Sequence, residues 1–66
     1  MRYPKWLLGQ KVAVVGTTIL GTVVEIKQHA GVWMVRLYHS ASWYDFFNVE
    51  VLAKEEYEDL RAGHVR

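Results

Sequence analysis

Residues 9–37 place the strongest constraint on the fold, because apolar and polar residues alternate there in short runs separated by glycine. The first alternating run covers 11–15 and ends at Gly16, the second covers 19–28, and the third covers 32–39. Alternation with a period of two indicates strands, and glycine favours the turns between them. This stretch therefore predicts three consecutive antiparallel strands.

The second half of the chain predicts two further strands and a helix. Alternating residues at 43–47 and 51–53 indicate short strands, and 54–61 places Tyr57 and Leu60 three residues apart on one helical face. Five short strands laid out flat would expose an apolar face and two edges, so we expect the sheet to close on itself. The predicted fold is all-β, a five-stranded barrel with a short C-terminal helix.

The chain of 66 residues has room for one domain. We expect an N-terminal strap at 1–9, the barrel at 10–53, the helix at 54–61 and a flexible tail at 62–66.

Alternation also predicts which side chains face the core. Val23 does not fit the pattern, because the alternation of its strand predicts that this apolar side chain points toward the charged face. Gly21 within the same strand indicates a bulge or a sharp bend. The residues expected to point inward are Val12, Val14, Val24, Ile26, Trp33, Val35, Leu37, Tyr44 and Phe46.

Two segments resemble a known group of folds. Gly9-Gln-Lys-Val-Ala-Val, with Gly16, Gly21 and the following Thr-Val-Val-Glu-Ile, is similar to the first hairpin of SH3-like small barrels, above all their KOW and Tudor-like groups. The stretch 43–52 resembles the fourth strand, tight turn and fifth strand of such a barrel. KOW segments occur in ribosomal proteins and transcription elongation factors, so the resemblance implies a nucleic-acid partner. The loop at 17–20 lacks the Lys and Arg that KOW loops often use on RNA.

A second resemblance is to plasmid-borne type II dihydrofolate reductases, which are short SH3-like barrels that assemble around one active site. Their active-site strand carries a Val-Gln-Ile-Tyr motif, whereas the comparable stretch here, 43–47, has no glutamine. His29, His39 and His64 are scattered, and the chain has no cysteine to complete a metal site. We therefore predict a protein that is not an enzyme and has no metal or cofactor.

The net charge of +1 is the sum of a basic N-terminal part and an acidic C-terminal part. Residues 1–44 carry five basic side chains against one acidic one, a net of +4, and residues 45–66 carry three against six, a net of −3. A basic barrel with an acidic tail is one interpretation, and a solvated helix face is the other. No apolar run approaches the roughly 20 residues that span a bilayer, so we expect a soluble, cytoplasmic protein.

Nucleic-acid binding in a transcription or translation setting is the first functional prediction. Cations would hold phosphates and aromatic rings would stack on bases. The residues predicted to do so, on the outer side of neighbouring strands, are Lys11, Lys27, Arg36, Tyr38 and Trp43.

The alternative is a protein-interaction adaptor or a homo-oligomerising regulator, because an exposed aromatic patch often marks an interface. If Trp43 and Phe47 point outward, the neighbouring strand brings them beside Met34, Arg36 and Tyr38. Rings around one carboxylate would also suit a cage for a methylated cation. The predicted interface residues are Met34, Tyr38, Trp43 and Phe47.

Overall fold

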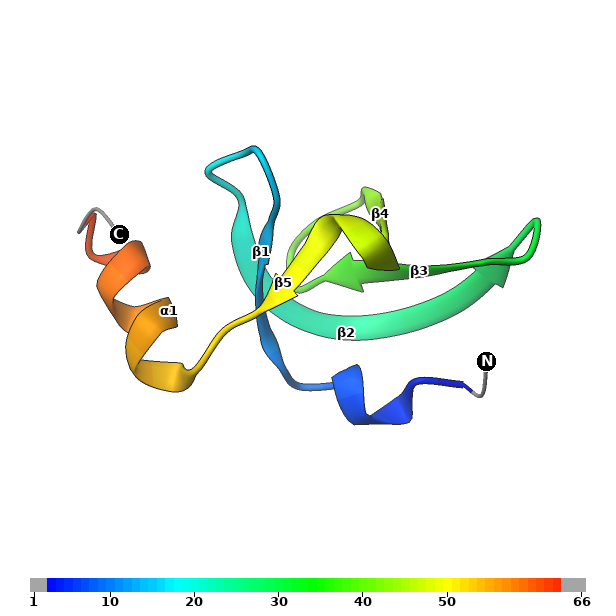
Figure 1. Ribbon diagram of the computed structural model, residues 1–66, viewed down its shortest axis with the longest axis horizontal. Coiled ribbons are helices and arrows are strands. Elements are labelled where there is room, and N and C mark those ends of the chain that lie inside the picture. Colours follow the sequence, from blue (N-terminus) through cyan, green and yellow to red (C-terminus); the bar gives the residue numbers. More distant parts are fainter. Residues whose placement is uncertain (1–2, 64–66) are drawn as a thin grey trace.

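The computed structural model describes residues 3–63, which form one five-stranded antiparallel sheet and one C-terminal helix. The strand order is β4-β3-β2-β1-β5 (Figure 1). A short 3-10 helix precedes β1, and a second one joins β4 to β5. The elements in chain order are η1 (Lys5–Leu7), β1 (Lys11–Val14), β2 (Leu20–His29), β3 (Val32–Leu37), β4 (Trp43–Asp45), η2 (Phe46–Asn48), β5 (Val49–Val51) and α1 (Lys54–Arg61).

The predicted number of strands and the predicted helix are confirmed, but the fourth strand is shorter than expected. It ends at Asp45 because the Asp45 carboxylate accepts a hydrogen bond of 3.0 Å from the backbone N–H of Phe47. This contact caps a 3-10 turn, the kind of local bond by which aspartate ends regular structure. The chain therefore leaves the β4 ladder two residues before the predicted end, and β5 begins at Val49.

The predicted closure of the sheet into a barrel is wrong. β4 pairs only with β3, and β5 pairs only with β1, so these two strands are the edges of an open sheet. η2 carries the chain from one edge to the other, and no ladder joins the two edge strands. Each edge is three residues long, and very short edges resist pairing with other chains.

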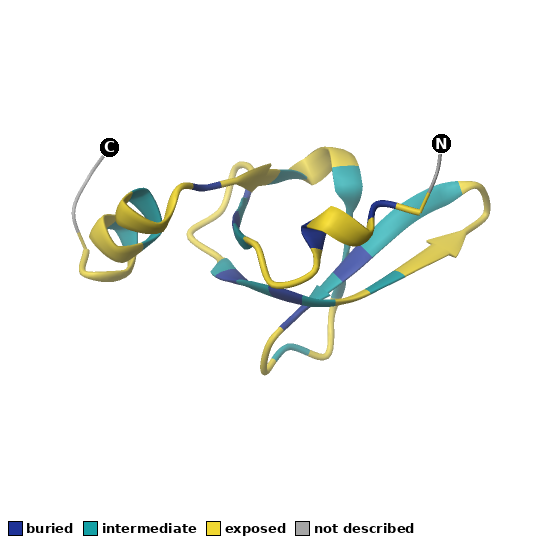
Figure 2. Ribbon diagram, turned by 90° about the horizontal axis from the view of Figure 1, so that it is seen from below, coloured by how far each residue is buried: buried dark blue, intermediate teal, exposed yellow. Residues whose placement is uncertain are grey.

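The core lies on the inner side of this bent sheet. Val12, Val14, Val35 and Leu37 are buried as alternation predicts, and Tyr44 and Phe46 pack partly buried against them. Leu7 of η1 is fully buried and closes one side, so part of the N-terminal strap belongs to the core. Figure 2 shows the buried residues gathered toward the middle of the molecule, whereas α1 and the tip of the β2–β3 hairpin are exposed or half-buried.

The predicted orientation of Val23 is wrong, because β2 contains an irregularity that single-strand alternation does not show. Val23 pairs with Leu37 and Glu25 pairs with Arg36, so Val24 has no partner of its own. Such a bulge places two residues opposite one and shifts the phase of the strand. Val23 is therefore in the core at 1% exposure, Val24 is half-buried, and Ile26 still packs inward as predicted.

Gly21 was predicted to mark a bulge or a sharp bend, and the register irregularity lies not there but between Val23 and Glu25. A Cβ at Gly21 would lie 2.9 Å from both Cβ and Cδ1 of Leu37. The glycine therefore allows β2 to approach the fully buried Leu37 on β3 where the sheet bends (Figure 1).

The helix α1 lies at one end of the molecule, beyond β5 and away from the β2–β3 hairpin (Figure 1). None of its residues is fully buried. Lys11 of β1 contacts it, with Nζ 5.2 Å from the centre of the Tyr57 ring. Within residues 3–63, no helix is long and apolar enough to cross a membrane.

The bulge predicts unequal effects for two adjacent valines. Val23→Ala removes two methyl groups from the core, and we expect it to lower the free energy of unfolding by about 2 kcal/mol. The matched change Val24→Ala is expected to cost less than about 1 kcal/mol, because that side chain is half-buried. Urea denaturation of both variants measures the difference. Equal losses, or a larger loss at Val24, would contradict the bulge.

Candidate functional site

The register of β2, β3 and β4 builds a two-row array on the side of the sheet away from the core. One row consists of Glu25, Arg36 and Trp43, and the other of Lys27, Met34 and Asp45. These six residues are called the outer face. Arg36 and Trp43 are direct cross-strand partners, so the predicted juxtaposition of this cation with this ring is confirmed.

The Arg36 side chain is already engaged within the protein. It forms an ion pair and a hydrogen bond with the Glu25 carboxylate, and its second contact is a hydrogen bond of 2.8 Å to the backbone oxygen of Ser40. The carboxylate offsets the guanidinium charge. Arg36 therefore offers a flat polar surface beside Trp43 more than a free positive charge.

Lys27 is the second cation of the outer face, and it contacts Trp43. Its Nζ lies 4.2 Å from the centre of the Trp43 ring. A cation over an indole face at an exposed site is worth about 0.5–1 kcal/mol. The pair brings together a positive charge and an aromatic surface, the two groups that a nucleotide needs.

Lys11 does not join this pair, although its strand neighbours β2. Its Nζ donates a hydrogen bond of 2.7 Å to Thr22 Oγ1 and also contacts Tyr57 of α1. Thr22 and Lys27 are five residues apart on β2, which is roughly 16 Å of extended chain. The basic stripe predicted from the sequence is thus divided into two separate groups.

Tyr38 follows the end of β3 and is 64% exposed. Its ring lies 4.0 Å, centre to centre, from that of His39, which has a positive φ of 63°. Tyr38 is therefore an exposed aromatic ring that contacts His39 and lies beyond the rows of the outer face.

Phe47 does not extend the outer face, contrary to the prediction that placed it with Met34 and Tyr38. It lies in η2, where the chain has left the sheet, and it is 77% exposed. Its ring is 5.6 Å from that of Phe46, which packs against the core. The two adjacent phenylalanines thus have opposite environments.

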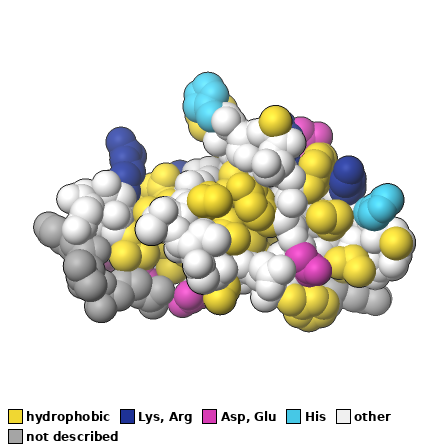
Figure 3. Space-filling view, turned by 90° about the horizontal axis from the view of Figure 1, so that it is seen from above, with side chains coloured by type: hydrophobic (Ala, Val, Ile, Leu, Met, Phe, Trp, Pro, Cys, Tyr) yellow, Lys and Arg dark blue, Asp and Glu magenta, His cyan; other side chains and the backbone are white. Residues whose placement is uncertain are grey.

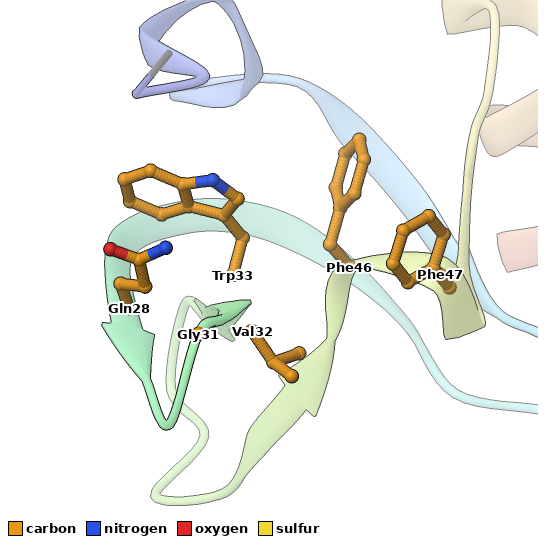
Figure 4. Close-up of a pocket in the computed structure, with 6 residues that line it drawn as sticks. All are labelled: Gln28, Gly31, Val32, Trp33, Phe46 and Phe47. Atoms are coloured by element: carbon orange, nitrogen blue, oxygen red, sulfur yellow. The ribbon is translucent and has the colours of Figure 1, made fainter. Parts of the chain in front are cut away.

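Phe47 instead forms part of a pocket between η2 and the β2–β3 hairpin (Figure 4). The cavity has a volume of about 150 Å³. None of its lining side chains carries a charge. We call it the Phe47 pocket, and its lining residues are Gln28, Gly31, Val32, Trp33, Phe46 and Phe47.

Trp33 of the pocket lining carries a buried polar atom without a partner in residues 3–63. In Figure 4 the indole nitrogen lies on the edge of the ring turned toward Phe46. This Nε1 atom is buried, and no residue of 3–63 accepts a hydrogen bond from it. The ring of Tyr3 packs edge-on against the Trp33 ring, with centres 5.6 Å apart and planes at 67°. The ring is therefore held by aromatic packing and not by its polar group.

Sequence reasoning did not find this pocket. Trp33 and Phe46 were correctly placed on the inner side, but the pocket needs Phe47 to turn with η2. The available signal was Asp45, since an aspartate side chain can accept a hydrogen bond from the backbone N–H two residues on and so compete with a continued strand.

The described residues contain no group of three His, Asp or Glu side chains that could hold a metal ion. His29 and His39 lie within this part of the chain, and His64 lies outside it. The end of the predicted tail at 64–66 and the start of the strap at 1–2 also lie outside it.

Comparison with protein-family models, with curated proteins and with solved structures finds no match to this chain. The functional argument therefore depends on the outer face and the Phe47 pocket themselves.

The unpaired indole nitrogen predicts an unusual tolerance at Trp33. Trp33→Phe removes a buried donor that costs about 1–3 kcal/mol when unpaired, which offsets the loss of ring area. We expect the free energy of unfolding in urea to change by less than about 1 kcal/mol. The control Trp33→Ala removes the packing as well and should cost at least about 2 kcal/mol. A Phe variant as unstable as the Ala variant would show that the N–H is bonded.

Proposed function

We propose that this protein is a non-catalytic interaction module whose Phe47 pocket and rim bind another polypeptide. We also propose that its fold is related to the SH3-like small barrels. The short turn η2 between β4 and β5 fits the fourth strand, tight turn and fifth strand of that group. The strand order, in which β1 pairs with both β2 and β5, is compatible with a bent small barrel that has stayed open.

The exposure of Phe47 is the observation that carries the proposal. A phenyl ring at 77% exposure keeps most of its apolar area in water, and burying that area is favourable by about 25 cal/mol per Å². Phe46 packs against the core and contacts this ring. Phe47 is therefore presented on a fixed support.

A second exposed apolar residue lies in a turn whose backbone contacts η2. Val15, in the β1–β2 turn, is 59% exposed, and its backbone N–H donates a hydrogen bond of 2.7 Å to the oxygen of Asn48, the neighbour of Phe47. Figure 3 shows hydrophobic side chains gathered in the middle of one face of the molecule. Contiguous exposed apolar surface marks interaction sites.

The chemistry of the pocket favours a polypeptide over a nucleic acid. Its lining is aromatic and aliphatic, with Gln28 as the one polar side chain. Interface centres in proteins are enriched in aromatic residues and depleted of charge. Nucleic-acid sites depend on cations for most of their affinity, and the lining has none.

Photo-crosslinking tests the proposal. Replacing Phe47 by the photoreactive residue p-benzoylphenylalanine should give a covalent adduct with another polypeptide in extracts of the source cells. The same replacement at Tyr38, an aromatic residue of similar exposure outside the pocket, is the control and should give several-fold less. Where the adduct is with a different protein, excess unlabelled wild-type protein should suppress it, and excess Phe47→Ala should not. Adducts at Tyr38 that match or exceed those at Phe47 would refute the proposal.

A second candidate function is binding of single-stranded nucleic acid at the outer face, and the Lys27–Trp43 pair favours it. One ring for a base and one cation for a phosphate lie 4.2 Å apart. The guanidinium of Arg36 lies across the strand from the ring, but Glu25 offsets its charge. Affinity from so few cations is modest and falls with added salt.

Trp43→Ala separates this candidate from the first. Losing one stacked base should weaken binding of a mixed-sequence single-stranded RNA by about tenfold. Because Trp43 is half-buried, its loss should cost less than about 1.5 kcal/mol of folding stability. Fluorescence anisotropy at low and high salt measures the affinity, and Phe47→Ala is the control that should bind as wild type does. Absence of wild-type binding at low salt would remove this candidate.

A further inference from the structure

We infer that the polypeptide bound by the Phe47 pocket is a second copy of this chain, and that two copies exchange their Phe47 rings across a two-fold axis. The inference rests on the proposed function, because it assigns a partner to the same surface. Three observations lead to it: the position of Phe47, the size of the pocket and the absence of charge in its lining.

The position of Phe47 makes the exchange reciprocal. The residue lines the pocket and also projects into solvent at 77% exposure. In a two-fold contact the same surface serves both partners, so a projecting group and its receptor must lie side by side on one chain. Here the projecting Phe47 ring is itself part of the pocket lining. A two-fold rotation about an axis close to the pocket would therefore bring the Phe47 ring of each chain to the pocket of the other.

The size of the pocket fits one phenyl ring. Its volume is about 150 Å³ and it opens to solvent; an enclosed apolar cavity of about this volume holds a benzene molecule, so the pocket has room for one phenyl ring. Val32, Trp33 and Phe46 supply three apolar walls. Aromatic rings that meet edge-to-face or offset gain about 0.5–1.5 kcal/mol beyond the area they bury.

The absence of charge distinguishes this surface from others on the chain. Near a two-fold axis each group lies opposite its own copy, so a charged surface there repels itself. The lining of the Phe47 pocket carries no charge. By contrast, Lys27 lies on the outer face, and Glu55 and Glu58 lie on α1.

The small core gives self-association a physical reason. The buried hydrophobic core side chains of residues 3–63 are Leu7, Val12, Val14, Val23, Val35, Leu37 and Leu52. Chains of about this length bury a smaller share of their surface than larger domains, and oligomerisation is a common way to add to it. Each inserted Phe47 extends the core through Phe46, which already packs against it.

The exchange would also leave the outer faces free. Trp33 lines the pocket, and the next residue, Met34, belongs to the outer face on the opposite side of β3. A dimer joined through the pocket therefore displays two copies of the outer face. Two linked sites bind a repetitive partner more tightly than one does.

Sedimentation equilibrium of the full chain tests the inference. Between about 1 µM and 1 mM, a range that covers weak and moderate dimers, wild-type protein should shift from the monomer mass toward twice that mass. Phe47→Ala should raise the dissociation constant at least about tenfold, as loss of a central anchor does. Tyr38→Ala, the matched aromatic control, should associate as wild type does. Wild type that stays a monomer throughout, or a Phe47→Ala variant that dimerises equally well, would overturn the inference.

Isotope-filtered NMR on a mixture of labelled and unlabelled protein locates the contact. We expect intermolecular nuclear Overhauser effects between Phe47 ring protons and the indole protons of Trp33. Contacts that place Phe47 against another surface would overturn the exchange even if a dimer forms. A monomer that still gives a Phe47-specific crosslink to a different protein would overturn this inference and leave the proposed function intact.

Discussion

The sharing of β2 between two ladders is the constraint on which the rest of the structure depends. One end of this strand pairs with β1 and the other with β3, so a single strand must turn apolar side chains inward in both halves of the sheet. The bulge at Val24 makes this possible by keeping Val23 and Ile26 on the core side. A slip of one residue would exchange the inner and outer sets. The charges of Glu25 and Lys27 face outward as a consequence of that core packing.

A second local interaction decides the chemistry of the other surface. The Asp45 carboxylate accepts a hydrogen bond from the N–H of Phe47 and ends β4. The turn that follows directs Phe46 toward the core and Phe47 into solvent. A hydrogen bond of this kind contributes only about 1 kcal/mol. Its importance lies in the direction that it gives to two adjacent rings.

The sequence predicts those parts of the fold that depend on local alternation. Val12, Val14, Val35 and Leu37 were placed correctly because each lies in a regular run. Val23 was placed wrongly because a bulge is a relation between two strands, and the pattern of one strand does not contain it.

Closure was also predicted wrongly, for a related reason. A sheet of five short strands can bury its apolar face by closing into a barrel or by bending while it stays open. The alternation of apolar and polar residues along each strand is the same in both cases. Here the connection from β4 to β5 forms η2, and no ladder joins the two edge strands.

The candidate sites were harder to predict than the fold, because each combines contacts that come from different strands. The pairing of Arg36 with Trp43 follows from the β3–β4 register and was anticipated. The contact of Arg36 with Glu25 was not, because it depends on the register beyond the bulge. The Phe47 pocket is lined by residues of β2, β3 and η2, so the pattern of any one segment does not predict it.

The two sides of β3 consequently select partners by different physics. On the outer side, a guanidinium paired with a carboxylate presents a dipole, whose field falls off faster with distance than that of a lone charge. Recognition there depends on the rings and on Lys27 at short range. On the inner side, the Phe47 pocket is uncharged and selects by apolar fit, which salt does not screen. We therefore expect the affinity for a partner at the outer face to fall as ionic strength rises, and the affinity for a partner in the Phe47 pocket to be insensitive to it. Adjacent residues of β3 form both surfaces.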